Sequence, residues 1–331
     1  MRTRTFGPTG LVVSEIGLGL AALGRPGYIT IGHHKDLKGN YAVAAVEAHA
    51  HGVLDAAWQV GVRYYDAARS YGRAEEFLGS WLRARDIPRS DVVVGSKWGC
   101  RYTADWEVDA STHEEEDHTP ANLRQQWIET RSHLGDYLCL YQIHSVASDC
   151  GVLADLAVLE ELAHLKGQGI HIGLSVTGPK QADVLRQGLA TTLDGTRLFD
   201  AVQATWNLLE RSCGPVLQEA RDAGMGVIVK EALANGRLTP RNDAANFSRR
   251  LALLKDEAAR RDTTVDALAL AAALAQPWAD VVLSGAATEE QVRSNATALM
   301  VPWDTEAANR LLCLAEPPDA YWETRARLPW N

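Results

Sequence analysis

The chain has 331 residues, of which 46% are hydrophobic and 23% charged, and its net charge is −9. This composition is typical of a globular protein, and the acidic balance excludes the basic stripe of a nucleic-acid-binding surface. No apolar run approaches the ~20 residues of a membrane span, and the first residues lack the apolar stretch of a signal peptide. The five scattered cysteines show no C-x-x-C spacing, which favours reduced thiols, a cytoplasmic setting and no metal site.

The predicted elements begin with a hairpin, in which Thr3–Phe6 and Leu11–Val13 flank a turn-forming Gly-Pro-Thr-Gly segment. Eight short apolar segments follow, mostly β-branched or aromatic, as in strands that are buried on both faces. They are Glu15–Leu20, Arg63–Ala67, Val92–Lys97, Leu138–His144, Ile170–Ser175, Ala201–Ala204, Gly226–Lys230 and Val281–Ser284. Segments of helical periodicity separate them, and Val265–Ala275 is apolar nearly all round, which predicts a buried helix.

Strands that alternate with helices predict a parallel sheet. Eight such units in one chain favour a closed (β/α)₈ TIM barrel, so we expect a single α/β domain over residues 1–331. The structural alternative is an open doubly wound sheet, which should carry G-x-G-x-x-G after an early strand. Gly17, Gly19 and Gly24 do not have that spacing.

Three stretches interrupt the alternation. Residues 24–40 and 99–120 are long connections after the first and third strands, and residues 301–331 form a tail with one predicted helix, Thr305–Leu314. The acidic run Glu114–Asp117 within the second connection is interpreted as a solvated loop. Tryptophans in the tail leave open whether it covers the barrel rim or a second subunit, so a homo-oligomer stays an open alternative.

Nearly every predicted strand ends, on its C-terminal side, in a polar residue, and in a barrel those ends converge on the face that holds the active site. Four residues there suit the reduction of a carbonyl. A tyrosine gives the proton, but its ordinary pKa of ~10 makes it a weak acid at neutral pH. A nearby ammonium lowers that pKa, a carboxylate balances the buried ammonium, and a neutral imidazole orients the carbonyl oxygen. The residues are Asp66, Tyr71, Lys97 and His144.

The segments that carry these residues, GVRYYDAARSYG, VVVGSKWG and LYQIHS, resemble the aldo-keto reductase superfamily. The resemblance covers nearly the whole chain. It implies hydride transfer between the nicotinamide C4 of NAD(P)(H) and a carbonyl or alcohol, with Asp66, Tyr71, Lys97 and His144 as the catalytic tetrad. Tyr71 would be the general acid and base of that reaction.

The resemblance also implies a cofactor site. Ser175 and Gln203 would bind the carboxamide and Trp206 would stack on the nicotinamide ring. Lys230, Ala232, Leu233 and Gly236 would line the pyrophosphate, and Gly285, Gln291 and Asn295 belong to the segment that would bind adenosine. NADP(H) is the family expectation, but Ala287 stands where many members carry a cation for the 2′-phosphate, and this leaves NAD(H) open.

Tyr28, Trp98 and Trp106 are expected to wall the substrate pocket, for a small aldehyde, ketone or sugar. Three other functions stay open. The first is the reverse reaction, as an NAD-preferring sugar or alcohol dehydrogenase. The second is a cofactor-binding regulatory subunit with little turnover. The third is an unrelated barrel lyase or isomerase with Lys97 as a Schiff base, which would leave Tyr71, Gln203 and Trp206 without a role.

Overall fold

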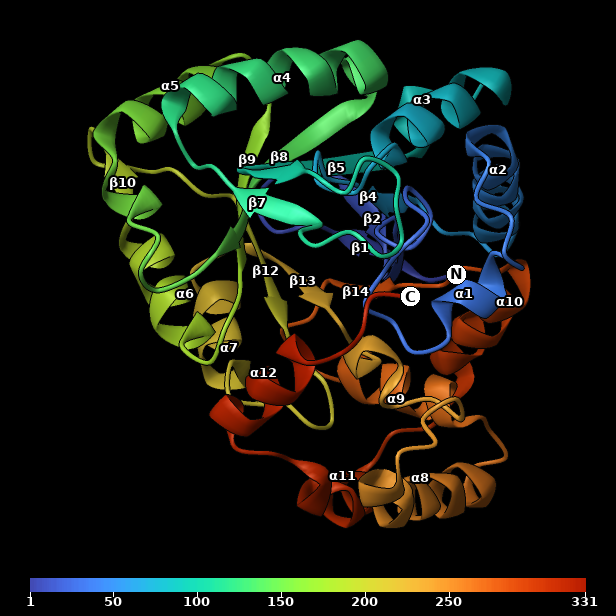
Figure 1. The fold of residues 1–331 in the computed structure, drawn as a ribbon. Helices are drawn as coiled ribbons and strands as arrows, with labels where there is room; N and C mark the ends of the chain where they lie inside the picture. The colour runs from blue at the N-terminus through green and yellow to red at the C-terminus, as the bar shows by residue number, and fades with distance from the viewer.

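The computed structural model describes all 331 residues and contains a closed barrel of eight parallel strands (Figure 1). Each strand pairs with the next along the chain, and pairing of the last with the first closes the ring. All eight predicted strands are confirmed, two with the predicted ends and six with ends that shift by at most two residues. They are β3 (Ile16–Gly19), β4 (Tyr64–Asp66), β5 (Val93–Trp98), β8 (Leu138–Val146), β9 (His171–Val176), β12 (Ala201–Thr205), β13 (Gly226–Lys230) and β14 (Val281–Ser284).

The predicted N-terminal hairpin closes the floor of this barrel. Its strands are β1 (Thr3–Thr5) and β2 (Val12–Ser14), and the fully buried Phe6 between them packs against Tyr64 in the barrel interior. Gly226 faces the Phe6 ring, and a Cβ at that position would lie 2.6 Å from it. A larger residue at 226 would therefore push the plug out of the barrel.

Helices surround the strands and bury a continuous apolar layer against them. The α-helices that follow barrel strands are α2 (Val43–Gln59), α3 (Ala74–Ala84), α4 (Pro120–Leu134), α5 (Leu156–Gly167), α6 (Gln181–Ala190), α7 (Gly214–Asp222), α8 (Ser248–Arg260), α9 (Val265–Leu274) and α10 (Glu289–Ala296). Short 3₁₀ turns lie at Arg89–Asp91, Gly135–Tyr137, Val152–Ala154, Ala234–Gly236, Ala245–Phe247, Thr297–Met300 and Leu312–Leu314. Helix α9 is buried over most of its surface, as its sequence predicts.

The long connections contain structure that the sequence did not indicate. Residues 24–40 include the short helix α1 (His33–Asp36), and residues 99–120 form a hairpin of β6 (Cys100–Tyr102) and β7 (Glu114–Glu116). A second small hairpin pairs β10 (Thr192–Leu193) with β11 (Thr196–Arg197) across an Asp-Gly turn. Part of the solvated loop expected at 114–117 is thus a strand, and its acidic composition gave no indication of β-structure.

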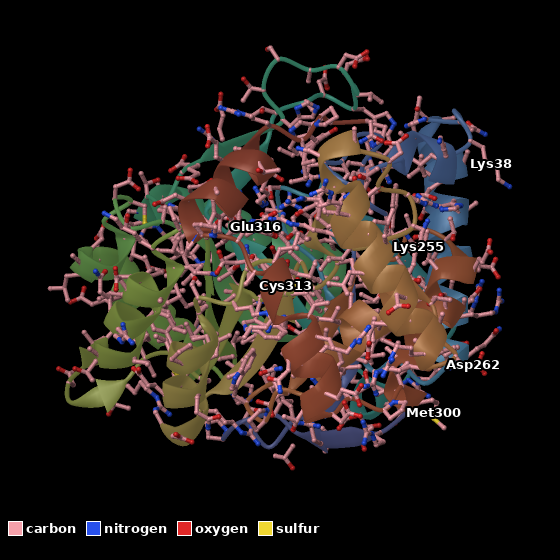
Figure 2. All side chains as sticks on the ribbon, turned by 90° about the horizontal axis from the view of Figure 1, so that it is seen from below. Lys38, Lys255, Asp262, Met300, Cys313 and Glu316 are labelled. Atoms are coloured by element: carbon pink, nitrogen blue, oxygen red, sulfur yellow. The ribbon has the colours of Figure 1, made fainter.

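The C-terminal tail returns to the barrel mouth (Figure 1). The single predicted helix is α11 (Thr305–Arg310) followed by a 3₁₀ turn, and the sequence analysis missed α12 (Pro318–Ala326). Glu316, labelled in Figure 2, ties the tail to the body through ion pairs with Arg237 and Arg250. The last residue pairs its backbone with Tyr28, with two N–H···O bonds of 3.2 Å. No helix has the length and apolarity that crossing a membrane requires.

Candidate active site

A cavity of about 1000 Å³ opens at the C-terminal ends of the barrel strands. It extends from Tyr71 and His144 over the barrel to the N-terminal turn of α10. Side chains at the ends of five strands line it, namely Asp66, His144, Gln203, Lys230 and Ser284. The polar strand ends that the sequence analysis singled out therefore do converge on one concave face, which is where a barrel carries its chemistry.

The four residues of the expected tetrad lie together at one end of this cavity. Lys97 is fully buried, and its ammonium forms an ion pair with Asp66 and donates to the carbonyl oxygen of Ala67 at 2.9 Å. The same Nζ lies 3.4 Å from the phenol oxygen of Tyr71. That phenol oxygen lies 3.3 Å from Nε2 of His144. Tyr71 is thus the one side chain that contacts both the ammonium and the imidazole.

Asp66 is the centre of a buried hydrogen-bond network. While Oδ1 takes the Lys97 ammonium, Oδ2 accepts from the Tyr64 hydroxyl at 3.2 Å, from Gln142 at 3.2 Å and from Gln203 at 3.0 Å. The sequence analysis missed Gln142, although it lies two residues before His144 and so faces the same side of β8. Gln203 lines the cavity as expected, but its amide nitrogen is held by this carboxylate.

The protonation states of the phenol and the imidazole follow from burial. Burial, reinforced by the charge of Asp66, raises the pKa of Tyr71 well above its ordinary value. Burial, reinforced by the charge of Lys97, lowers the pKa of His144 well below its ordinary value. The phenol is therefore protonated and the imidazole neutral at neutral pH. The acidification of Tyr71 expected from Lys97 does not result, because burial and the charge of Asp66 raise the pKa of the phenol.

The residues expected to bind a dinucleotide all line the cavity except Ser175 and Trp206. Those that line it are Gln203, Lys230, Ala232, Leu233, Gly236, Gly285, Gln291 and Asn295. Ser175 is fully buried beside Gln203, with which it is paired across β9 and β12, and its hydroxyl has no hydrogen-bond partner. A buried hydroxyl without a partner, such as that of Ser175, fits a site in which the carboxamide of a bound nicotinamide would supply the missing hydrogen bond.

Trp206 does not lie where the sequence analysis expected it. Its side chain is 5% exposed, packs edge-on against Trp278 at 5.7 Å, and is absent from the cavity wall. Strand β13 lies next to β12, and its last residue, Lys230, points into the cavity instead. The stacking role expected for Trp206 is therefore not supported, because its ring lies in the apolar layer outside the barrel.

The substrate end of the cavity differs from expectation in two of three residues. Tyr28 lines it, whereas Trp98 is fully buried against His118 and Trp106 packs on Phe77 with its indole donating to Tyr41. Neither tryptophan lines the cavity, because Trp98 belongs to the apolar layer between the strands and the helices and Trp106 packs on α3. Correcting that expectation, the structure supplies two other walls, which are Arg25 and Trp330.

Arg25 is a buried guanidinium beside the Tyr71 ring. It is 2% exposed, pairs with Glu114, and donates to the carbonyl oxygen of Ser70 at 2.9 Å. Its Cζ lies 5.3 Å from the Tyr71 ring centre and 4.8 Å from that of Trp330. No pattern within one segment could have indicated this cluster, since its members come from four distant parts of the chain.

The far end of the cavity carries charges of both signs, with Asp36, Asp266, Glu289 and Glu290 beside Lys35, Lys38, Arg241 and Arg293. Glu289 and Glu290 occupy the first turn of α10, and Asp36 of α1 accepts from the Gln291 side chain at 3.1 Å. Two arginines nearby are already engaged. Arg241 holds Asp36 through bonds of 2.9 and 2.6 Å, and Arg293 pairs with Glu289 at 2.9 Å. The sequence analysis missed Asp36 and Arg241, which meet across the cavity.

No three side chains among His, Cys, Asp and Glu gather as a metal site would require. Several charged residues of the cavity instead form ion pairs with one another, such as Arg241 with Asp36 and Arg325 with Glu231.

Comparisons with known proteins give one consistent family. The model of the Aldo/keto reductase family matches residues 15–315. An NADH-specific methylglyoxal reductase of Escherichia coli is 28% identical over 351 aligned positions, which cover 96% of this chain and 99% of that protein. An L-galactose dehydrogenase of Arabidopsis thaliana is 25% identical, with 95% and 94% covered. The fold is similar to that of an aldo-keto reductase of Bacillus halodurans in its holo form, with a TM-score of 0.74, 24% identity, and 96% and 97% of the two chains covered.

Proposed function

Because the chain belongs to the aldo/keto reductase family and is an NAD(P)H-dependent oxidoreductase, we propose that Tyr71 is its general acid and base. The supporting observation is the position of the Tyr71 hydroxyl, which contacts both Lys97 and His144 at the end of a deep cavity. A bound nicotinamide would supply the hydride. The protein has to hold the carbonyl and deliver a proton to its oxygen.

The neighbours of Tyr71 have separate tasks in this proposal. Ser70 lies 3.2 Å from Nδ1 of His144. If its hydroxyl donates there, the neutral ring carries its proton on Nε2, beside the phenol, where it can donate to a carbonyl oxygen. Lys97 donates toward the Tyr71 oxygen and stabilises the phenolate that remains after proton transfer. Asp66 keeps the ammonium charged in a buried place.

We expect Tyr71→Phe to abolish carbonyl reduction while cofactor affinity stays within a few-fold of the wild-type value. The change removes one oxygen atom and keeps the ring that packs beside Arg25. Turnover of a panel of short aldehydes, ketones and sugars measures the first effect, and titration of tryptophan fluorescence with NADH and NADPH measures the second. Full activity of this variant would show that another group supplies the proton.

The carboxylates in the first turn of α10 favour NAD(H) over NADP(H). A 2′-phosphate there would meet Glu289 and Glu290 without a free arginine, since Arg293 is already paired. The two unpaired cations of this end of the cavity, Lys35 and Lys38, lie on α1 and just after it. Carboxylates suit the hydroxyl of an unmodified ribose and repel a phosphate. NADH should therefore bind at least about tenfold more tightly than NADPH in the same fluorescence titration. Tighter binding of NADPH would contradict this assignment.

The substrates we propose are small polar carbonyl compounds or sugar lactols. Tyr28, Arg25 and Trp330 give the cavity beside Tyr71 both polar and aromatic surface. Two relatives are named for methylglyoxal and for L-galactose, a small dicarbonyl and a sugar. The second name keeps oxidation of a sugar as the alternative direction. Running the same panel with reduced and with oxidised cofactor distinguishes the two.

A further inference from the structure

The last residue of β13 places a lysine inside the barrel mouth. Side chains alternate along a barrel strand between the interior and the helix layer, and Ile228 of β13 belongs to the small cluster inside the barrel. Lys230, two residues later, faces the same way and lines the cavity together with Asp66 and His144. Its charge contributes to the lowered pKa of His144. Lys230 is therefore close to the reacting end, not only to the region expected to hold phosphates.

Every other charged side chain at this end of the cavity has an ion-pair partner. Lys97 pairs with Asp66, Arg25 with Glu114, and Arg325 of α12 with Glu231. Those three pairs are neutral as a group. Lys230 forms no ion pair and donates no hydrogen bond, because the neighbouring Glu231 carboxylate is held by Arg325 at 2.6 and 2.9 Å. The mouth is left with one uncompensated positive charge.

We propose that Lys230 makes the site bind the reduced nicotinamide more tightly than the oxidised one. The inference rests on the proposed function, since it requires that a nicotinamide ring occupy the barrel mouth. The ring carries a positive charge only in its oxidised form, so an unpaired ammonium nearby repels that form and leaves the reduced one unaffected. Two like charges separated by up to about 10 Å, at an effective dielectric constant of about 20, repel strongly enough for a difference of roughly tenfold or more.

This preference would determine which form of the cofactor occupies the enzyme. Where the oxidised cofactor is in excess, a site that binds both forms equally is occupied mostly by the oxidised form, and carbonyl reduction is inhibited. A site that disfavours the pyridinium fills with the reduced form and releases the oxidised product readily. Lys230 would thus make the protein a carbonyl reductase rather than a dehydrogenase under such conditions.

The proposal predicts a pH dependence of known sign. Burial lowers the pKa of Lys230 to about 8, with the charge of Glu231 acting in the opposite direction. Below that pH the ammonium is present and discriminates; as pH rises through it, the charge and the discrimination are lost. Those groups near Lys230 whose pKa is shifted move away from that pH. Arg325 has a raised pKa, Glu231 and His144 have lowered ones, and burial raises the pKa of the thiols of Cys100 and Cys213. Asp66 and Lys97 face Lys230 as a buried ion pair.

The test is the ratio of the dissociation constants of NAD⁺ and NADH, measured by quenching of tryptophan fluorescence. In the wild-type protein at about pH 6.5, we expect NADH to bind at least about tenfold more tightly than NAD⁺, and the ratio to shrink at about pH 9.5. Lys230→Met should reduce the ratio at low pH and remove its pH dependence. Lys230→Arg should retain the ratio at both pH values, because the guanidinium stays charged.

Lys255→Met, on the outer surface of α8 (Figure 2), is the matched control and should change nothing. Equal weakening of both cofactor forms by Lys230→Met would show that the ammonium binds a phosphate, and an unchanged ratio would show that it has no part in the discrimination. Either result overturns the inference. Failure of the wild-type protein to bind either form would instead overturn the proposed function, and thermal unfolding of each variant checks that it is folded.

Discussion

The Asp66 carboxylate shows how one residue serves both stability and chemistry. It accepts four hydrogen bonds from side chains of four different strands, which are β4, β5, β8 and β12. Its partner Lys97 is completely buried. A buried ion pair of this kind contributes little net stability when intact, but the loss of one partner leaves an uncompensated charge in a medium of low dielectric constant.

We expect Lys97→Met to lower the free energy of unfolding by about 3–5 kcal/mol and to remove nearly all carbonyl reduction. The first effect comes from the stranded Asp66 carboxylate and the second from loss of the ammonium beside the Tyr71 oxygen. Denaturant unfolding and turnover measure them separately. In the double variant Asp66→Asn with Lys97→Met, stability should recover while activity should not. Recovery of activity as well would show that the ammonium has no part in catalysis.

At the scale of elements, the eight barrel strands were predictable because strands buried on both faces are short continuous apolar runs. The tetrad was predictable because each member lies at or just after the end of such a run. The elements within the long connections and the tail were not predictable in this way. Hairpin β6–β7 is made of strands of three residues, with an exposed acidic second strand, and α12 begins at a proline in a tail without strong periodicity. Pairing and packing with distant segments determine these elements.

The difference between local pattern and long-range packing also explains which residues of the candidate site could be predicted. Lys230 and Trp206 lie near the ends of neighbouring strands, and only the alternation of β13 decides that the lysine faces the interior. Arg25, Glu114 and Trp330 come from two rim loops and the tail, and meet only in the folded chain. Their cluster could not be predicted from any local pattern.

The tail lines the cavity through Trp330, beside the place proposed for the substrate, and the effect of removing it can be predicted. Deletion of residues 328–331 removes Trp330 from Arg25 and the backbone pairing with Tyr28. We expect KM for carbonyl substrates to rise about tenfold, in line with a desolvated cation–π contact of about 1–2 kcal/mol, while cofactor affinity changes by less. Steady-state kinetics and fluorescence titration measure the two.

The control for the truncation is Arg327→Ala, which removes an exposed surface pair with Glu323 just before the deleted segment. It should leave both constants unchanged. An unchanged KM in the truncated protein would mean that the last residues do not shape the substrate site.

In the whole molecule, the two ends of the barrel have different roles. The floor is apolar and closed by the hairpin, with Phe6 packed among interior residues of the barrel strands. The mouth holds the buried charges and the cavity. Between them, the interior changes from apolar side chains such as Ile228 to polar ones such as Lys230 within two residues of a strand. A substitution in the floor should therefore change stability without changing the chemistry of the mouth.

This separation predicts the behaviour of a substitution in the floor. Phe6→Ala should lower the free energy of unfolding by about 3–5 kcal/mol, because it leaves a cavity among residues that cannot easily collapse into it. Its effect on kcat/KM, per folded molecule and well below the melting temperature, should be less than about twofold, since Phe6 contacts no residue of the mouth. Denaturant unfolding and kinetics with a single aldehyde measure both. A large loss of activity in the folded variant would show that packing of the floor positions Asp66 through Tyr64, which contacts both the plug and the carboxylate.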